Sequence, residues 1–287
     1  MRGTIHSVAP TVDFRTVLVE DAAMPLEGFE ESSFTDRGVT RPIYRRGTGP
    51  SVVIVHEIPG IIPQVAEFGR RVADTGLTAV LPVLFGTPGK PLSTGYLVQQ
   101  IGLACIRREF TTFALGRSSP VTEWLRGLCR QVHAECGGPG VGAIGMCLTG
   151  GYALALMVDS SVMAPVLSQP SCPFPISAAH RASIDVSPAE LSEVKRRVAE
   201  GTPVLGLRFT RDRACPPERF DLLRRELGNG FEAIEIDSGP GNSHGIPQSA
   251  HSVLTVDLVD RPGHPTRAAL ERVLAFFQER LLDREAP

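Results

Sequence analysis

The sequence predicts an α/β protein with a mostly parallel central sheet, helices on both faces and an antiparallel hairpin at its N-terminal side. From residue 51 onward, short β-branched segments alternate with segments whose apolar residues recur at helical spacing. No linker-like stretch interrupts this alternation. Alternating strands and helices require right-handed crossovers, so we expect about six parallel strands with helices on both faces.

Chain length and composition favour a single large domain. The 287 residues, of which 42% are hydrophobic, suffice for one full-sized core. We expect a leader over residues 1–27, with a short strand at 14–19, followed by one domain over 28–287.

The N-terminal part of the domain predicts a hairpin at the edge of the sheet. Residues 29–36 and 39–47 are polar and meet at a turn containing Arg37 and Gly38. Pro42 has no amide hydrogen for a ladder, which places this hairpin at an edge.

The next segments form the first β–α–β unit. Residues 51–57 are a nearly unbroken β-branched run, typical of a strand that is covered on both faces. Residues 65–76 carry apolar side chains at helical spacing and end at a glycine, and residues 77–84 read as the following strand. Residues 86–117 show no regular pattern, so we expect an irregular segment there.

The rest of the chain repeats the alternation. A Ser-Pro pair at 119–120 predicts a helix start, and a basic last turn supports the helix that ends near residue 201. The expected strands cover residues 139–146, 164–171, 203–210 and 231–237, and the expected helices cover 119–137, 148–159, 188–201, 218–228 and 265–282.

Charge and composition exclude several classes of function. The net charge of −2 arises from 29 basic and 31 acidic residues that are interspersed, which argues against nucleic acid or an anionic membrane as partner. No apolar run approaches the roughly 20 residues that span a bilayer, and the N-terminus has no apolar signal core. We therefore expect a cytoplasmic protein that acts on a small molecule, and the sequence leaves its oligomeric state open.

The cysteine pattern gives no sign of a disulfide framework or a metal site. Six cysteines occur without regular spacing, and neither a CxxC nor an HxxxH pair is present. We expect neither a metal ion nor an organic cofactor.

One cysteine lies where a nucleophile would be placed. Cys147 follows a predicted strand and opens a predicted helix, with Gly145 and Thr149 as small residues two positions away on either side. Small neighbours permit the strained turn that exposes a nucleophile, and a helix N-terminus favours a thiolate. The backbone amide of Leu148 would then face an oxyanion formed on the acyl carbon. A buried cysteine in a glycine-rich packing corner is the simpler alternative.

An acid and a base follow in the order that a catalytic triad uses. Asp212 lies in the loop after the strand at 203–210, where an aspartate could orient a histidine or only cap a turn. Asp185, Asp221 and Asp237 occupy less suitable positions.

The base is either of two histidines. His244 and His251 both follow the strand at 231–237, and both satisfy the order nucleophile, acid, base. His264 lies too close to the final helix.

A further carboxylate ends the first parallel strand. Glu57 follows four apolar residues and one histidine, so it is costly to bury without a partner. It could pair with an arginine, or it could hydrogen-bond the thiol or the histidine and tune the thiol. The amide of Ile58 would be the second donor to an oxyanion.

These residues together resemble the dienelactone hydrolase family of α/β-hydrolases over residues 30–282. By this resemblance Cys147 matches the nucleophile, Asp212 the acid, and Glu57 the family glutamate that interacts with the resting thiol. The sequence Ala-His-Ser followed by an apolar residue points to His251 as the base. The segments that carry the resemblance are SVVIVHEIPGI, GAIGMCLTGG, TRDRACPP and AHSVLT, in that order.

The chain departs from the family pattern at two places. An insertion, residues 238–249, separates the last strand from His251 and carries His244, which therefore stays the alternative base. The family holds a substrate carboxylate with arginines, but the segment with Arg107, Arg108 and Arg117 does not align, so that role is not carried over.

The resemblance implies a hydrolase of lactones, carboxylic esters or thioesters that uses a Cys-His-Asp triad and an acyl-enzyme. An acyltransferase with the same thiol would share these residues. A non-catalytic α/β-hydrolase-fold protein that binds a small molecule is the alternative from another class, because fold and motif do not prove activity.

Overall fold

The computed structural model describes residues 26–106, 119–184 and 186–282. Nearly all of the expected leader, its strand at 14–19 and the three arginines of the unaligned segment lie outside these ranges.

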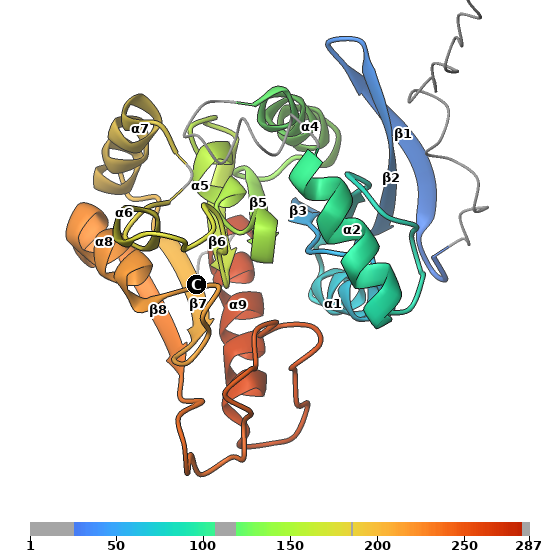
Figure 1. The fold of residues 1–287 in the computed structure, drawn as a ribbon. Helices are drawn as coiled ribbons and strands as arrows, with labels where there is room; N and C mark the ends of the chain where they lie inside the picture. The colour runs from blue at the N-terminus through green and yellow to red at the C-terminus, as the bar shows by residue number, and fades with distance from the viewer. Residues whose placement is uncertain (1–25, 107–118, 185, 283–287) are drawn as a thin grey trace, which may run out of the picture.

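The described residues form one eight-stranded sheet in the order β1-β2-β4-β3-β5-β6-β7-β8 (Figure 1). β1 pairs with β2, and β2 with β4, in antiparallel fashion, whereas β3 to β8 run parallel. The predicted fold class is confirmed, including the hairpin at the sheet edge. The strands are β1 Glu30–Asp36, β2 Val39–Gly47, β3 Ser51–Val55, β4 Thr78–Pro82, β5 Val141–Met146, β6 Val162–Ser168, β7 Val204–Phe209 and β8 Phe231–Ile236.

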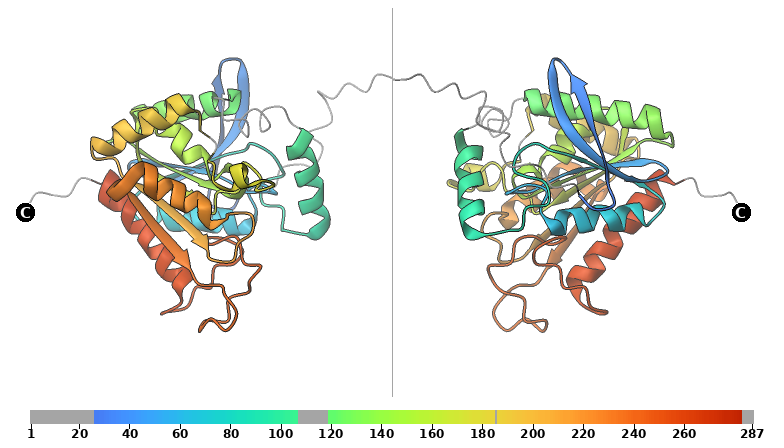
Figure 2. Two further views of the ribbon diagram at one scale, coloured as in Figure 1. Left: turned by 60° about the vertical axis from the view of Figure 1, so that its left-hand side comes forward. Right: turned by 90° about the vertical axis from the view of Figure 1, so that its right-hand side faces the viewer.

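Helices cover both faces because side chains of the central strands alternate between two apolar clusters. Val53 and Val55 of β3 belong to the cluster that includes residues of α4, α5, α7 and α8, whereas Val52 and Ile54 belong to the cluster that includes residues of α1 and α9. In the right-hand view of Figure 2, α4 lies above the sheet and α1 and α9 lie below it. The helices are α1 Pro63–Ala73, α2 Thr94–Ile106, α4 Pro120–Cys136, α5 Tyr152–Leu156, α6 Ala178–Arg181, α7 Pro188–Ala199, α8 Pro217–Leu227 and α9 Pro265–Leu281, with 3₁₀ turns η1 Cys147–Thr149 and η2 Gly228–Gly230.

Two expectations about helices are wrong. Helix α2 lies inside the segment expected to be irregular. The sequence did not predict this helix because its apolar residues are not confined to one face and so give no helical period. The helix expected over 148–159 is split into η1 and the short α5. The amide of Gly150 donates to the carbonyl of Cys147 at 2.9 Å, an i→i+3 bond that closes a 3₁₀ turn before α5 begins.

The expected start of the helix after residue 118 is confirmed at atomic detail. The Ser119 hydroxyl accepts a hydrogen bond from the amide of Thr122 at 3.2 Å, and Pro120 is the first helical residue.

The topology gathers the candidate residues at one edge of the sheet. Glu57 follows β3, Cys147 follows β5 and Asp212 follows β7, so all three lie beyond the carboxyl ends of parallel strands. His251 lies in the long connection between β8 and α9, which extends beyond the sheet at the bottom of Figure 1. Among the described helices, none is both long and apolar enough to cross a membrane.

Candidate active site

The backbone around Cys147 is a strained turn that only small neighbours permit. Cys147 has φ +55°, in the left-handed region that L-residues rarely occupy. A Cβ atom on Gly145 would lie 2.0 Å from the carbonyl oxygen of Thr149, and one on Gly150 would lie 2.4 Å from Cα of Pro170. The requirement for glycine at 145 agrees with the sequence analysis. Gly150 is a second position where the close approach of the backbone at Pro170 leaves no room for a side chain.

Thr149 does more than leave space beside the cysteine. Its buried hydroxyl accepts a hydrogen bond from the amide of Met146 at 3.1 Å. The same hydroxyl lies 3.0 Å from the carbonyl oxygen of Val55 and 3.1 Å from that of His56. Thr149 therefore ties the turn at the end of β5 to the end of β3, a role that spacing in the sequence did not reveal.

The structure brings His251 and Asp212 into direct contact. Nδ1 of His251 lies 2.7 Å from Oδ2 of Asp212, whose side chain is only 4% exposed, against 25% for His251. Burial alone lowers the pKa of His251. The charge of Cys147 and hydrogen bonds to Asp212 and Cys147 outweigh this and raise the pKa well above its usual value. Asp212 and Cys147 therefore both favour the protonated imidazole.

Arg208 fixes the loop that carries Asp212. Its guanidinium is 1% exposed and donates to the carbonyl oxygens of Cys215 at 2.9 Å and Thr210 at 3.1 Å, which lie on either side of the aspartate. It also pairs with Glu235 of β8 at 2.5 Å. Since this buried charge is paired and hydrogen-bonded, it can hold the loop rigidly at the end of β7.

A second carboxylate fixes the loop that carries His251. Oδ2 of Asp257 accepts hydrogen bonds from the backbone amides of His251 at 2.8 Å and Ser252 at 2.9 Å. Two consecutive amides bound to one carboxylate oxygen define where the backbone of His251 lies. Asp257 is a half-buried residue that the sequence analysis did not single out.

Glu57 has partners other than those expected. The expectation was a hydrogen bond to the thiol or the histidine. Instead, Glu57 accepts hydrogen bonds from the hydroxyls of Ser252, at 2.7 Å, and Thr255, and from the side-chain amide of Gln169 at 3.4 Å. Within the described residues, none of its hydrogen bonds goes to Cys147 or His251. Ser252, Thr255 and Gln169 hold the Glu57 side chain near His251 without a direct contact between the two.

The environment of Glu57 disfavours a carboxylate. The side chain is 2% exposed, and burial raises its pKa, although the hydroxyls of Thr255 and Ser252 counteract part of the rise. The expected costly burial is therefore offset by three hydrogen bonds from polar side chains rather than by an arginine.

The loop after β6 also contacts the cysteine turn. Gln169 is fully buried at φ +35°, and its side chain accepts from the hydroxyl of Ser168 while donating to Glu57. Two residues on, the amide of Ser171 donates to the carbonyl of Cys147 at 2.9 Å. Gln169 gave no signal in the sequence beyond a polar residue near the end of the strand expected over 164–171.

His56 is a neutral, buried residue that supports the loop after β3. The amide of Leu84 donates to Nε2 at 3.1 Å, so the proton is on Nδ1, which lies 3.0 Å from the carbonyl of Glu57. Burial lowers the pKa of His56 to about 4. This side chain therefore holds the backbone next to Ile58. Because β3 and β5 are paired neighbours, the amides of Ile58 and Leu148 follow adjacent strand ends.

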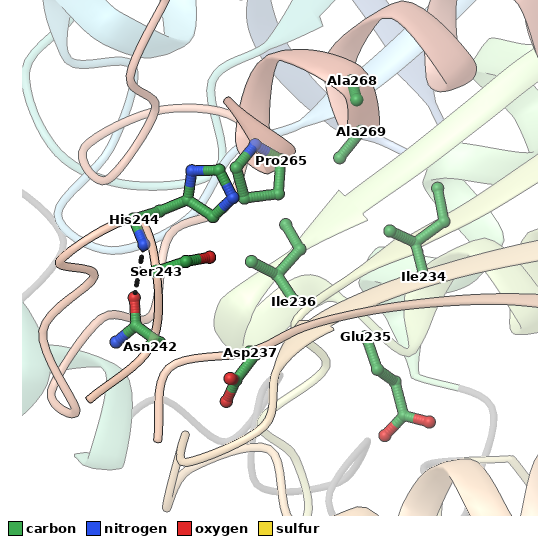
Figure 3. A pocket seen from close by; sticks show the side chains of 10 residues that line it. All are labelled: Ile234, Glu235, Ile236, Asp237, Asn242, Ser243, His244, Pro265, Ala268 and Ala269. Carbon is green, nitrogen blue, oxygen red and sulfur yellow. Dashed lines mark hydrogen bonds between the residues drawn. The ribbon is translucent and has the colours of Figure 1, made fainter. Parts of the chain in front are cut away.

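The alternative base, His244, lies elsewhere. It is exposed, its ring stacks edge-on against His264 at 5.3 Å, and it contributes to a separate cavity of about 460 Å³ (Figure 3). Figure 3 shows its ring beside Pro265, at the start of α9, and facing the side chains of β8. In the described structure the histidine bound to Asp212 is His251.

The other aspartates also have separate roles. Asp237 accepts hydrogen bonds from the amide of Gly239 and the hydroxyl of Thr210, and Asp221 pairs with Arg224 on α8. Asp185 lies outside the described residues.

A cavity of about 750 Å³ opens beside the His251–Asp212 pair. It is large enough for a small-molecule substrate. Across the described ranges no group of three or more His, Cys, Asp or Glu side chains is arranged to hold a metal ion. The cavity is lined by Arg181, Thr210, Arg211, Asp212, Arg213, Ala214, Pro217, Gln248, Ser249 and His251.

The sheet order and a cysteine on a strand-to-helix turn define an α/β-hydrolase. The chain belongs to the dienelactone hydrolase family, whose sequence profile matches residues 40–281. No curated protein matches the sequence.

Solved structures of family members share the fold at low sequence identity. A putative dienelactone hydrolase from Klebsiella pneumoniae subsp. pneumoniae has a TM-score of 0.60 and 18% identity, covering 88% of this chain and 98% of its own. Dienelactone hydrolase from Anabaena variabilis has a TM-score of 0.57 and 17% identity, covering 88% and 99%. A dienelactone hydrolase-like promiscuous phosphotriesterase from metagenomic libraries has a TM-score of 0.56 and 17% identity, covering 88% and 98%.

Proposed function

We propose that the protein is a cysteine hydrolase of ester-like bonds, acting on a lactone, a carboxylic ester or a thioester. The observation that carries this proposal is the placement of His251 between Asp212, at 2.7 Å, and Cys147 on its strained turn. An imidazole that is hydrogen-bonded to a buried carboxylate and close enough to a thiol for the two to affect each other's charge suits the roles of base, orienting acid and nucleophile.

In this proposal His251 removes the proton of the Cys147 thiol while the sulfur attacks the carbonyl carbon of the substrate. The amides of Leu148 and Ile58 donate to the oxyanion of the tetrahedral intermediate. As the intermediate collapses, His251 gives its proton to the leaving group and an acyl-enzyme remains. His251 then deprotonates a water molecule that attacks this thioester, which releases the acid and regenerates the thiol.

Asp212 sets the tautomer and orientation of the base. Because Nδ1 donates to Asp212, Nε2 is the nitrogen directed to the sulfur. The carboxylate also stabilises the imidazolium that forms during the reaction. These groups supply nucleophile, base and oxyanion donors, so the proposed chemistry needs no metal ion or organic cofactor. A free thiol nucleophile suits a reducing compartment, and we propose that the protein acts in the cytoplasm.

Replacement of the nucleophile tests the proposal. For Cys147→Ala we expect kcat/KM on 4-nitrophenyl acetate to fall roughly a thousandfold, since removal of a triad nucleophile removes the covalent route. Cys136→Ala, at the C-terminal end of α4, is the matched control and should keep wild-type activity. Full activity in Cys147→Ala would contradict the proposal.

Mass spectrometry and product analysis separate the alternatives. Rapid quenching should trap an acetyl group on the wild-type protein and on Cys136→Ala but not on Cys147→Ala. Hydrolysis predicts free acid even when alcohols or thiols are added, whereas an acyltransferase would form the acetylated acceptor. A non-catalytic binding protein would form no acyl-enzyme.

A further inference from the structure

We propose that the cavity of about 460 Å³ beside β8 and the start of α9 binds a small neutral aromatic alcohol, such as a phenol or a naphthol. Neither Cys147, Asp212 nor His251 is among the described residues that line this cavity, so the inference does not depend on the proposed hydrolase. One wall comes from the insertion at 238–249, which carries none of the proposed catalytic residues.

The floor of the cavity is apolar. Figure 3 shows the side chains of Ile234 and Ile236, both on β8, pointing towards the first turns of α9. From that helix the described lining residues are Pro265, Ala268 and Ala269, whose small side chains leave room for a ligand. An apolar ring placed here is removed from water against both the strand and the helix, which favours binding.

The opposite wall carries two polar side chains, Ser243 and His244. Figure 3 shows the ring of His244 beside Pro265 and the hydroxyl of Ser243 directed towards Ile236. In the part of the chain that the structure describes, neither this hydroxyl nor the ring nitrogens of His244 form a hydrogen bond, although the ring packs edge-on against His264. An imidazole and a hydroxyl can each donate and accept, and this pattern matches the hydroxyl group of a ligand.

Asn242 fixes the turn that carries these two side chains. Its side-chain amide donates to the carbonyl oxygens of Gly239 at 2.9 Å and Ile246 at 2.8 Å. Its side-chain oxygen accepts from the amides of His244 at 3.3 Å and Ile246 at 2.9 Å. Because the backbone on both sides of Ser243 is held, its hydroxyl and the His244 ring lose less freedom when a ligand binds.

The charges around the cavity favour a neutral ligand. Glu235 pairs with Arg208 at 2.5 Å and with Arg224, so its charge is balanced. Figure 3 shows the carboxylates of Glu235 and Asp237 pointing away from the first turns of α9. No lysine or arginine is among the described lining residues, so neither an anion nor an amine would meet an opposite charge inside the cavity.

The size and the walls of the cavity suit an aromatic ring. A volume of about 460 Å³ is typical of small-molecule sites. The exposed ring of His244 and the ring of Pro265 lie side by side on one wall, and aromatic rings pack well in offset or edge-to-face contacts. A fused ring has no rotatable bonds, so it buries apolar area with little loss of conformational entropy.

Two matched probes and two pairs of variants test the inference. The probes are 2-naphthol, which is neutral at pH 7, and 2-naphthoate, which is anionic. Ala268→Leu fills the cavity from an exposed position on α9, and His244→Ala removes the polar partner. The controls are Ala275→Leu, on the same helix but outside the cavity, and His133→Ala, on α4.

Calorimetric titration of the wild-type protein should show saturable binding of 2-naphthol and weaker binding of 2-naphthoate. The Kd of 2-naphthol should rise roughly tenfold or more in Ala268→Leu and in His244→Ala, since each change removes a main contact, and should keep the wild-type value in both controls. In NMR spectra the ring resonances of His244 should shift as 2-naphthol is added.

Urea unfolding curves identify the variants that are folded, and either test variant alone suffices if the other is not. Wild-type affinity for 2-naphthol in a folded test variant would overturn the inference. Absence of saturable binding to the wild-type protein, or equal binding of the two probes, would also overturn it.

Discussion

Replacing Asp257 tests whether the backbone of His251 must be held in place for activity. In Asp257→Ala the amides of His251 and Ser252 both lose their acceptor, which lies at 2.8 and 2.9 Å. Asp257 touches neither the sulfur nor the imidazole in these contacts, so it is a positioning residue.

The expected loss of stability follows from these two hydrogen bonds. A hydrogen bond to a charged group contributes about 1.5–3 kcal/mol. Solvent screening at this half-buried carboxylate reduces each contribution to about 1 kcal/mol, so we expect a loss of about 2 kcal/mol in the free energy of unfolding. A shift of the imidazole by about 1 Å can lower the rate about a hundredfold, so we expect kcat to fall between tenfold and a hundredfold.

The assay separates positioning from folding. We expect kcat of Asp257→Ala to fall with little change in KM, and Asp257→Asn to recover part of it because its amide oxygen still accepts one or both bonds. Asp260→Ala is the matched control, since Asp260 lies three residues after Asp257 and pairs with Arg71 and Arg267. If Asp257→Ala loses about 2 kcal/mol of stability but keeps wild-type kcat and pH profile, the positioning role is refuted.

Three further perturbations have expected outcomes. Asp212→Asn removes a charge that raises the pKa of His251, and His251 must be neutral to act as the base, so the acidic limb of kcat/KM should move to lower pH; an unchanged limb would contradict this. The pKa of His56 is lowered to about 4. The unfolded chain therefore binds more protons than the native state between about pH 6.5 and 4, and stability should fall by about 3 kcal/mol as the pH drops through that window. His56→Gln should flatten this loss in urea unfolding curves. A Cβ on Gly145 would lie 2.0 Å from a backbone carbonyl oxygen, so Gly145→Ala should unfold at a clearly lower temperature, whereas Gly95→Ala, with open space around it, should not.

Much of the fold was readable from local patterns. The β-branched run at β3 and the apolar segments at β5 and β7 predicted a parallel sheet, because strands covered on both faces need continuous apolar sequence. The same patterns placed Cys147, Asp212 and Glu57 after strand ends, and parallel strands bring such ends to one edge of the sheet. Helix α2 was missed because its apolar residues have no one-sided period.

The partners of the site residues depended on tertiary structure. Both His244 and His251 follow β8, and spacing along the chain does not distinguish them. Packing of the β8–α9 connection directs His251 to Asp212 and leaves His244 beside His264. Glu57 likewise meets hydroxyls that lie nearly 200 residues away in the chain.

The sequence by itself therefore determined the order of the elements, the glycine-flanked turn at Cys147 and the edge of the sheet where chemistry is expected. These properties follow from hydrophobic periodicity and from steric limits within a few residues. Only the tertiary structure decided which histidine meets Asp212, which groups surround Glu57, and that Asp257 holds the histidine loop. Those contacts join distant segments through loops, whose conformations depend on the packing of the whole domain rather than on local preference.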